Sequence, residues 1–395
     1  MNPAVPFDVA IVGGAMVGAA AARALAGERI ALISQEPRPA PISAPQEFDT
    51  RVYAISPGNA AFLARLGAWN AIAADRLTPV HAMRVHGDDG SSLIKFDAYR
   101  SGVSELAWIV EDGRVQDALW RGLETQERLS VHAGTPIRDV HIGDSAANIV
   151  LDDGRSLAAR LVIGADGARS LVRSRAGISG DAQEYGQTAV VANFACSRPH
   201  RNVAWQWFQG AARGGAVLAL LPLPGDHVSM VWSVRTADAA RLLALDGETL
   251  AREVAAAAQH ALGDFSLVTP ARGFALQRLA AGRLVAPRVA LAGDAAHVIH
   301  PLAGQGANLG LQDARLLAEV LAARAPGRDP GDLRLLRRYE RSRAEAILAM
   351  SATVHGLHRL FGSPAPAASR LRNAGLNFAD RLPVLKNLLM RHAMG

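Results

Sequence analysis

A run of small and polar residues that begins at Gly293 carries the side chains best suited to holding a ligand. Arg288 to Ala292 reads as a short buried strand, and Asp294 follows it almost at once. A carboxylate at the end of a buried strand can accept hydrogen bonds from a sugar-like polyol. The glycines beyond it predict a turn into a helix whose first N–H groups face an electron-rich ring or a phosphate. The residues of this block are Gly293, Asp294, Ala295, Ala296, His297, Pro301, Gly304, Gly306, Asn308 and Asp313.

The first apolar segment, Phe7 to Val12, also leads into a glycine-rich turn, made of Gly13, Gly14, Ala15 and Gly18. In a dinucleotide-binding turn the first glycine permits the turn, the second lets the backbone approach a pyrophosphate, and the third lets helix and strand pack closely. Ala15 takes the middle position here. Ser34 stands where an acidic residue would hold ribose hydroxyls, and Glu36 follows two residues later. Taken alone, the turn is also compatible with a loop that binds no nucleotide.

Hydrophobic periodicity places both turns on an α/β framework. The first 33 residues predict strand, turn, helix and strand. Further helices are predicted at about 57–75, 115–126 and 309–323, and further strands at 131–140, 147–151, 156–163 and 288–292. A β-hairpin is predicted from residues 83–85 and 92–96, and the remainder of the chain to residue 395 is mostly helical in composition.

A block of strand-forming segments interrupts this framework between about residues 186 and 235. The segments are 188–195, 203–208, 215–221 and 228–234. Such a block suggests an inserted second domain with an antiparallel sheet. Trp205 and Trp207 alternate along one segment and share a face, which is either domain core or the lining of an apolar substrate cavity. Tyr53 has the same two interpretations.

Composition excludes several classes of protein. The 395 residues are half hydrophobic and one-fifth charged, which is typical of a folded protein of two or three domains. The single cysteine, Cys196, indicates a reducing compartment. The basic residues behind the net charge of +6 are scattered and nearly all arginine, without a nucleic-acid-binding pattern, so no nucleic-acid partner is expected. We find no hydrolase triad, no metal-binding pattern, no signal peptide and no apolar run long enough to span a membrane.

Taken together, the motifs resemble those of the class A FAD-dependent aromatic hydroxylases, the para-hydroxybenzoate-hydroxylase-like group. The amino-acid sequence from Gly293 to Gly310 most resembles that of the bacterial ubiquinone-biosynthesis hydroxylases. Other segments that match this family are Asp49-Thr50-Arg51-Val52, Gly164-Ala165-Asp166-Gly167 with Arg169 and Ser170, and the tail with Arg372 to Leu376, Leu382-Pro383 and Lys386. The resemblance covers essentially the whole chain.

The resemblance implies an α/β fold with a Rossmann-like FAD-binding domain, an inserted β-rich substrate domain and a helical C-terminal region. The FAD-binding domain is expected at 1–75, 100–180 and 280–345, the substrate domain at 76–99 and 181–279, and the C-terminal helices at 346–395. The expected FAD-binding residues are Gly13, Gly14, Ala15, Gly18, Arg51, Gln116, Asp166, Asp294, Pro301, Gly304, Gly306 and Asn308. Tyr53, Trp205, Trp207 and His300 are the expected substrate-lining residues, and His297 is expected to have a structural role. The pattern assigns no catalytic base.

The activity implied is hydroxylation of the aromatic ring of a polyprenylated phenol in ubiquinone biosynthesis, with FAD as cofactor and NADH or NADPH as transient reductant. In this family the oxygen is transferred from a flavin C4a-hydroperoxide. The expected partners are a hydrophobic phenolic or quinone-precursor substrate and other ubiquinone-biosynthesis proteins. The expected location is the cytoplasm, with peripheral contact to the inner membrane as an extension. Two alternatives stay open: a non-catalytic scaffold or lipid carrier that binds FAD weakly, as Ala15 and Ser34 suggest, and a hydroxylase of another aromatic metabolite.

Overall fold

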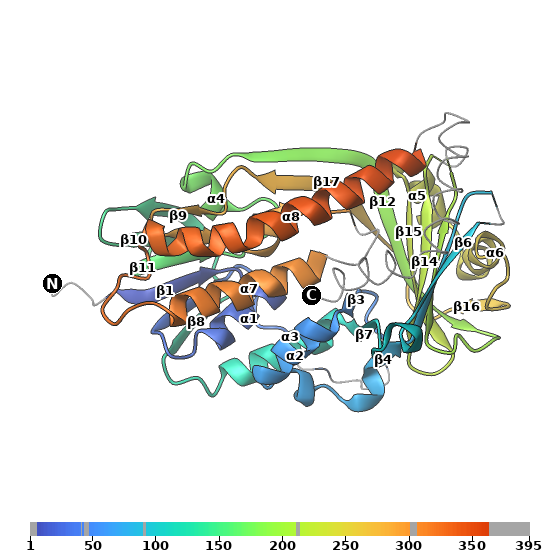
Figure 1. Ribbon diagram of the computed structural model, residues 1–395, viewed down its shortest axis with the longest axis horizontal. Coiled ribbons are helices and arrows are strands. Elements are labelled where there is room, and N and C mark those ends of the chain that lie inside the picture. Colours follow the sequence, from blue (N-terminus) through green and yellow to red (C-terminus); the bar gives the residue numbers. More distant parts are fainter. Residues whose placement is uncertain are drawn as a thin grey trace.

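The computed structural model describes residues 6–40, 42, 47–89, 92–210, 214–300 and 306–362, and it consists of two sheet-based bodies joined by long strands. Figure 1 shows a parallel sheet with its helices at one end of the molecule and a large antiparallel sheet at the other. The two bodies meet around a small third sheet. The chain passes between the bodies several times, so residues far apart in sequence become neighbours.

The first sheet, sheet A, is eight-stranded, with a central parallel part in the order β19-β11-β1-β2-β8. Its central strands are apolar and almost wholly buried, as expected for parallel strands covered on both faces. The parallel strands are β1 (Phe7–Val12), β2 (Ile30–Ser34), β8 (Leu129–Ala133), β11 (Ser156–Gly164) and β19 (Val289–Leu291), and antiparallel strands β9 (Ile137–Ile142), β10 (Ala147–Leu151) and β18 (Val285–Ala286) extend it.

Helices from both ends of the chain cover sheet A. The helix α1 packs against both α3 and α7, and α7 packs against α8 (Figure 1). Because the carboxyl ends of parallel strands share one edge, the turns after β1, β11 and β19 meet there. The helices of this body are α1 (Met16–Ala24), α2 (Pro57–Arg65), α3 (Asp112–Leu123), α4 (Leu171–Arg175), α7 (Gly306–Ala322) and α8 (Leu333–Gly362), with short 3₁₀ helices η1 (Trp69–Ala71), η2 (Ala74–Arg76) and η5 (Gly293–Ala295). A further 3₁₀ helix, η3 (Tyr99–Ser101), lies in the connection between the other two sheets.

The third sheet, sheet B, has three antiparallel strands in the order β3-β7-β4, namely β3 (Val52–Ile55), β7 (Ala107–Glu111) and β4 (Thr78–Val80). It contacts sheet C through a cluster that includes Val80, Ile109, Ala204 and Leu223. Sheet B therefore joins the two bodies.

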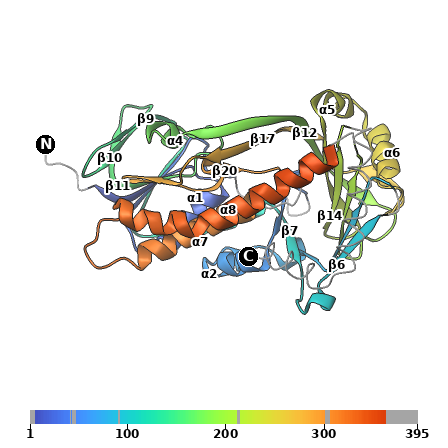
Figure 2. The same ribbon diagram turned by 45° about the horizontal axis from the view of Figure 1, so that its top comes forward.

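Sheet C is nine-stranded and mostly antiparallel, in the order β20-β17-β12-β15-β14-β13-β5-β6 with β16 beside β12. Its strands are β5 (Ala82–His86), β6 (Leu93–Asp97), β12 (Gly180–Cys196), β13 (Val203–Phe208), β14 (Val217–Leu223), β15 (His227–Arg235), β16 (Phe265–Leu267), β17 (Arg272–Ala281) and β20 (His297–Val298). Two helices, α5 (Thr236–Leu243) and α6 (Gly247–Ala257), pack on one face, here called the outer face (Figure 2). The opposite, inner face is directed toward sheet B.

The fold class predicted from the sequence is confirmed, and most predicted elements are present. Three element predictions were wrong. Residues 131–140 are not one strand, because Gly134, with φ +67°, and Pro136 break the segment into β8 and β9. Residues 57–75 contain one helix of nine residues followed by short 3₁₀ turns. The β-rich region also contains α5 and α6, whose helical pattern was missed.

The C-terminal prediction is only partly covered. The helix α8 extends to Gly362, and the rest of the predicted tail, including Lys386, lies outside the described residues. Within the described part of the chain, no helix combines the length and apolar character needed to cross a membrane. The division into domains at the residue numbers given above stays a prediction.

Candidate cofactor and substrate site

The glycine-rich turn after β1 is built for close approach between backbone segments. Gly13 has φ +112°, and a Cβ there would lie 2.1 Å from the carbonyl oxygen of Ala165. At Gly18 a Cβ would lie 1.8 Å from the carbonyl oxygen of Gly13, so the helix α1 begins in direct contact with the turn. Side chains are excluded at both positions by backbone atoms, which cannot move aside cheaply.

The start of α1 has the character of an anion site. Ala15 is the N-cap residue and provides no side-chain hydrogen bond, and the first turn contains no acidic residue. Its methyl group is exposed, so it does not fill the turn. The free N–H groups and the positive end of the helix dipole therefore favour a negatively charged group such as a phosphate.

The residues expected to hold a ribose are arranged differently from a standard turn. Ser34 is buried, and its Oγ donates to the carbonyl of Glu36 at 2.8 Å. The Gly134 N–H donates to the same carbonyl at 3.0 Å, so the chain turns back after β2. The Glu36 side chain is exposed at this bend. The Ser34 hydroxyl is thus engaged with the backbone, and the carboxylate that this arrangement offers to a ribose is that of Glu36.

The indole of Trp120 supports the same turn, although the sequence did not single it out. Trp120 lies on α3, is 3% exposed, and donates from Nε1 to the carbonyl of Gly14 at 2.9 Å. Its ring also stands where a Cβ on Gly14 would fall, at 2.9 Å. The indole thus fixes both the position and the orientation of the Gly14 peptide.

Replacing Trp120 with phenylalanine should weaken FAD binding by about fivefold and lower the free energy of unfolding by about 1 kcal/mol, because one buried hydrogen bond is lost and the ring shrinks. Fluorescence titration of apo-protein with FAD and thermal melting measure the two effects. Trp69, which is remote from the turn, provides the control as Trp69→Phe. Equal FAD affinities for wild type and Trp120→Phe would contradict the supporting role.

Asp294 lies in η5, directly beyond β19, and its side chain is exposed. The protein around it nevertheless raises the pKa of its carboxyl by burial, against the opposing charges of His297 and Arg51. Gly293, with φ +59°, makes the turn, and Val17 of α1 lies within 3.4 Å of the position of a Gly293 Cβ. The Asp294 turn and the start of α1 are therefore adjacent.

The side chain of Asn308 is hydrogen-bonded within the protein, and its contact with FAD stays a prediction. It is 1% exposed, accepts from Ser56 N–H at 2.9 Å, and donates from Nδ2 to Ala54 O at 2.7 Å. It also accepts from Asn59 Nδ2 at 2.9 Å. These bonds tie α7 to β3 and α2. Gly306 begins α7 with open space around it, whereas Pro301 and Gly304 lie outside the described residues.

A charged cluster with Arg51 at its centre lies at the start of sheet B. The Arg51 guanidinium is over the ring of Tyr53 at 5.9 Å and over that of Phe274 at 5.5 Å. Tyr53 and the carboxylates of Asp112, Asp294 and Asp49 together raise the pKa of Arg51, although burial opposes them. Since Phe274 belongs to β17, Arg51 links sheet B to the inner face of sheet C.

Tyr53 and Asp112 lie beside Arg51, and burial raises the pKa of both side chains. Burial, and then Asp112, raise the pKa of the Tyr53 hydroxyl, so it keeps its proton at neutral pH. Burial also raises the pKa of Asp112, against a hydrogen bond that Gln116 Nε2 donates to Asp112 Oδ1 at 2.7 Å. Gln116 thus orients Asp112, a residue that the sequence did not single out.

The Asp166 carboxylate is hydrogen-bonded within its own loop. It accepts from Ser170 Oγ at 2.5 Å and from Val172 N–H at 3.1 Å, and Ser170 caps α4. Burial raises the pKa of Asp166, with these hydrogen bonds opposing. A contact between Asp166 and FAD stays a prediction.

Trp205 and Trp207 stack on one another with ring centroids 5.7 Å apart, and His86 stacks against both. They lie on the outer face of sheet C, with the core cluster that contains α5 and α6. The inner face, which is near Arg51, carries their neighbours Ala204 and Gln206 instead, because side chains alternate along β13. The structure therefore places both tryptophans in the domain core, and the prediction that they line the substrate site is corrected.

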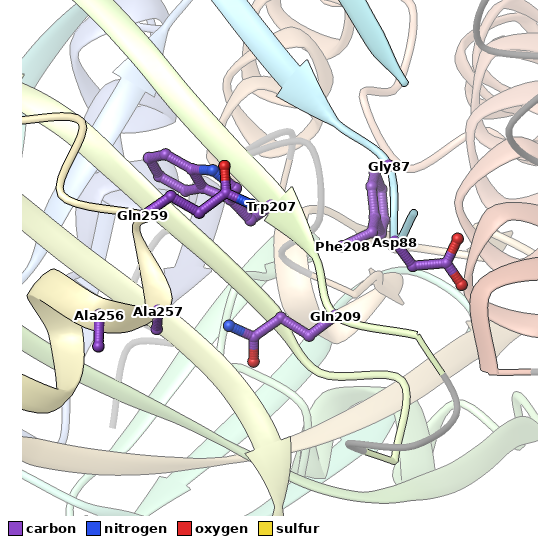
Figure 3. A pocket seen from close by; sticks show the side chains of 8 residues that line it. All are labelled: Gly87, Asp88, Trp207, Phe208, Gln209, Ala256, Ala257 and Gln259. Carbon is purple, nitrogen blue, oxygen red and sulfur yellow. The ribbon is translucent and has the colours of Figure 1, made fainter. Parts of the chain in front are cut away.

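A cavity of about 240 Å³ does lie beside Trp207, between sheet C and the end of α6 (Figure 3). Its other lining residues come from the β5–β6 turn, the end of β13 and the end of α6. Neither the Asp294 turn nor the Arg51 cluster contributes to it. This cavity is therefore separate from the candidate cofactor site.

His300 is 1% exposed and its Nε2 lies 3.1 Å from Gln187 Oε1. Tyr185 contacts its ring edge to face at 4.9 Å. Tyr185 belongs to an irregularity in β12 between Glu184 and Gln187, and bulges of this kind re-aim side chains. His300 thus joins sheet C to the loop after β20, and its contact with a substrate stays a prediction.

The residues present fit a bound FAD. The free N–H groups of α1 suit a pyrophosphate, the exposed carboxylate of Asp294 suits ribityl hydroxyls, and the two lie side by side through Val17. The inner face of sheet C offers an apolar surface next to Arg51, formed by Val191, Val231, Phe274 and Leu276. These three features are what a flavin and an aromatic substrate require.

Comparison with known proteins agrees with this geometry. The family model described as FAD binding domain matches residues 6–353. The 3-demethoxyubiquinol 3-hydroxylase of Escherichia coli (strain K12) is 34% identical over 99% of this chain and 99% of its own. The ubiquinone hydroxylase UbiL of Rhodospirillum rubrum is 36% identical over 98% of this chain and 89% of its own. The crystal structure of p-nitrophenol 4-monooxygenase PnpA from Pseudomonas putida DLL-E4 shares the fold, with a TM-score of 0.77, 20% identity and 98% of each chain covered.

Proposed function

The chain belongs to the family defined by this FAD binding domain, and from that premise we propose that it hydroxylates the aromatic ring of a polyprenylated phenol, a precursor of ubiquinone. It is an FAD-dependent aromatic-ring hydroxylase. The observation that carries the substrate proposal is the full-length similarity to two hydroxylases whose names specify ubiquinone or its precursor.

When bound and reduced by NADH or NADPH, FAD supplies the activation of O₂ for insertion of one oxygen atom into a phenolic ring. The chain supplies position and electrostatics. In our proposal, the N–H groups that begin α1 hold the pyrophosphate, and Asp294 accepts hydrogen bonds from the ribityl chain. Arg51 provides a positive charge next to the cofactor, balanced by Asp49, Asp112 and Asp294.

The Arg51 side chain is 57% exposed, and in our proposal the bound cofactor and substrate, together with the apolar surface beside Arg51, exclude water from the reaction. Phe274, Val191 and Val231 present apolar atoms on the inner face of sheet C. The Tyr53 hydroxyl keeps its proton, because burial raises its pKa, and so it can donate a hydrogen bond to a phenolic oxygen. The turn after β1 is the only one in the sequence that resembles a dinucleotide-binding turn, and none is left for the nicotinamide nucleotide. We therefore propose that this reductant binds transiently.

The test is production of the hydroxylated product. Expression in a strain that lacks its own 3-demethoxyubiquinol 3-hydroxylase should restore ubiquinone, and the purified protein should be yellow. Mass spectrometry of the accumulated intermediates identifies the ring position. A yellow protein that restores no quinone but hydroxylates another phenol would support the alternative of a different aromatic metabolite. A protein that stays colourless when FAD is added and restores no quinone in this strain would support the scaffold.

We propose further that the chain contacts membranes peripherally, since a polyprenylated substrate resides there. The net charge of +6 favours anionic head groups. Other ubiquinone-biosynthesis proteins are proposed as partners on the same ground. Sedimentation with anionic vesicles that does not exceed sedimentation with neutral vesicles would count against the membrane contact.

A further inference from the structure

The turn that carries Asp294 rests on a buried carboxylate, Asp313. Asp313 lies on α7 and is 0% exposed. Its Oδ2 accepts from the Gly293 N–H at 2.9 Å and lies 2.7 Å from His297 Nε2. Asp313 Oδ2 therefore contacts both Gly293, the residue before Asp294, and His297, three residues after it.

The other oxygen of Asp313 is held from α8. Arg343 Nε donates to Asp313 Oδ1 at 2.6 Å. The guanidinium also donates to Gln312 Oε1 at 3.0 Å and to the carbonyl of Leu309 at 3.1 Å. Arg343 is 2% exposed and is the largest fully buried side chain in the described part of the chain. Its three hydrogen bonds fix its position against α7.

The charges of this network are balanced. Burial alone would raise the pKa of Asp313, but His297, Arg343 and the Gly293 amide hold it below its usual range. Because Asp313 is ionised and lies 2.7 Å from His297 Nε2, that nitrogen carries a proton and donates to it. His297 Nδ1 is buried without a hydrogen-bond partner among the residues that the structure describes.

A contribution to stability alone does not account for such a network. Removing two charges from water is costly, and apolar residues of similar volume often stabilise a core as well or better. What the ion pair provides is a defined geometry. Gly293 has φ +59°, and its Cα lies 3.3 Å from the position of a Cβ on Gly310 of α7, so the turn packs directly against this helix. Because Asp313 is on the same helix and accepts from the Gly293 N–H, a small shift of Asp313 displaces the turn.

We propose that Arg343 is a positioning residue of the cofactor site, acting through Asp313 to hold the Gly293 N–H and His297 on either side of Asp294. The helix α8 further contacts this region through Tyr339, whose hydroxyl donates to the carbonyl of Leu291 at 2.8 Å. The proposal rests on the proposed function only in taking FAD as the ligand of the turn.

The experiment compares FAD affinity with apo-protein stability in four variants. In Arg343→Met, the uncompensated charge of Asp313 should lower the melting temperature of the apo-protein, and FAD affinity should fall by about 10- to 100-fold, as for outer partners of ligand-binding groups in general. The double variant Arg343→Met/Asp313→Leu should melt higher than the single variant, yet bind FAD as weakly. Arg343→Lys keeps the charge but cannot make three directed bonds, so it should be stable with intermediate affinity.

The matched control is Arg324→Met, at the other end of α7. Arg324 donates to both carboxylate oxygens of Glu28, at 2.7 and 2.9 Å. Its loss should lower the melting temperature without changing FAD affinity. FAD affinity that follows the melting temperature across all variants, or that stays within twofold of wild type in Arg343→Met, would overturn the proposal. Titration with FAD needs no phenolic substrate, so failure of hydroxylation alone leaves this inference standing.

Discussion

Asp294→Ala should bind FAD at least 100-fold more weakly than wild type and lose hydroxylation with it, while its apo-protein melts at an equal or higher temperature. A carboxylate that accepts hydrogen bonds from two hydroxyl groups contributes about 1.5–3 kcal/mol through each bond. Every 1.4 kcal/mol is about a tenfold change in affinity, so two lost bonds exceed about 100-fold.

The stability part of this prediction follows from the pKa of Asp294, which the surrounding protein raises above 3.8; because the side chain is exposed, the change in stability should be small. Since the folded state then binds the proton more tightly than the unfolded state, stability falls as the pH rises from about 3.8 through the folded pKa. Alanine removes this loss. The gain in melting temperature over wild type should therefore appear across that window and remain constant at higher pH.

Titration of apo-protein with FAD and thermal melting without FAD from pH 4 upward measure the two quantities. Asp294→Asn should show the same stability gain with a smaller loss of affinity, because the amide keeps one acceptor oxygen. Asp153→Ala, in an exposed turn, is the control: it should leave FAD affinity unchanged and should not raise the melting temperature, because Arg155 lowers the pKa of Asp153. Unchanged FAD affinity in Asp294→Ala would refute the assignment of this carboxylate to the cofactor. Full ubiquinone production by that variant would favour the scaffold alternative.

Gly13→Ala should lower the free energy of unfolding by about 3 kcal/mol or more and leave no measurable FAD binding. The backbone at Gly13 has φ +112°, which L-residues adopt only with strain. The added Cβ would also meet the Ala165 carbonyl oxygen at 2.1 Å. To relieve the contact, β1 and β11 must separate at the point where Val12 O accepts from the Ala165 N–H at 2.7 Å.

Chemical denaturation of the apo-protein and FAD titration at low temperature measure this effect. Gly27→Ala is the matched control, since a Cβ at Gly27 meets nothing within 4 Å and the residue has no positive φ. That variant should be as stable as wild type or slightly more stable, with unchanged affinity. A Gly13→Ala protein with wild-type stability would show that the turn does not require the observed backbone geometry.

Much of the fold was predictable because its signals are local. Apolar runs identified β1, β2 and β19, of which β1 and β19 lead into glycines, and strand-forming segments identified most strands of sheet C. The prediction failed where a local signal had two interpretations. Residues 131–140 were predicted as one strand, yet Gly134 and Pro136 divide the segment into β8 and β9. The helices α5 and α6 were missed inside a region dominated by strands.

The candidate site shows the same division more clearly. Asp294, Gly13 and Gly18 could be identified from sequence, since the chemistry of each depends on its own backbone turn. Asp112, Trp120 and Arg343 could not, because their partners Arg51, Gly14 and Asp313 lie 61, 106 and 30 residues away in the chain. The motif predicts that Asn308 contacts the cofactor, but only the tertiary structure shows that its amide holds β3 and α2 to α7.

The sequence by itself determined the type of fold, the family and the kind of cofactor, because glycine conformations, strand periodicity and the order of the motifs are properties of the chain. The tertiary structure decided which face each side chain occupies. Trp205 and Trp207 are equally apolar on either face of β13, and only the packing of α5 and α6 assigned them to the core. Arg343 is an ordinary helix arginine until α8 lies against α7, where burial turns it into the partner of Asp313.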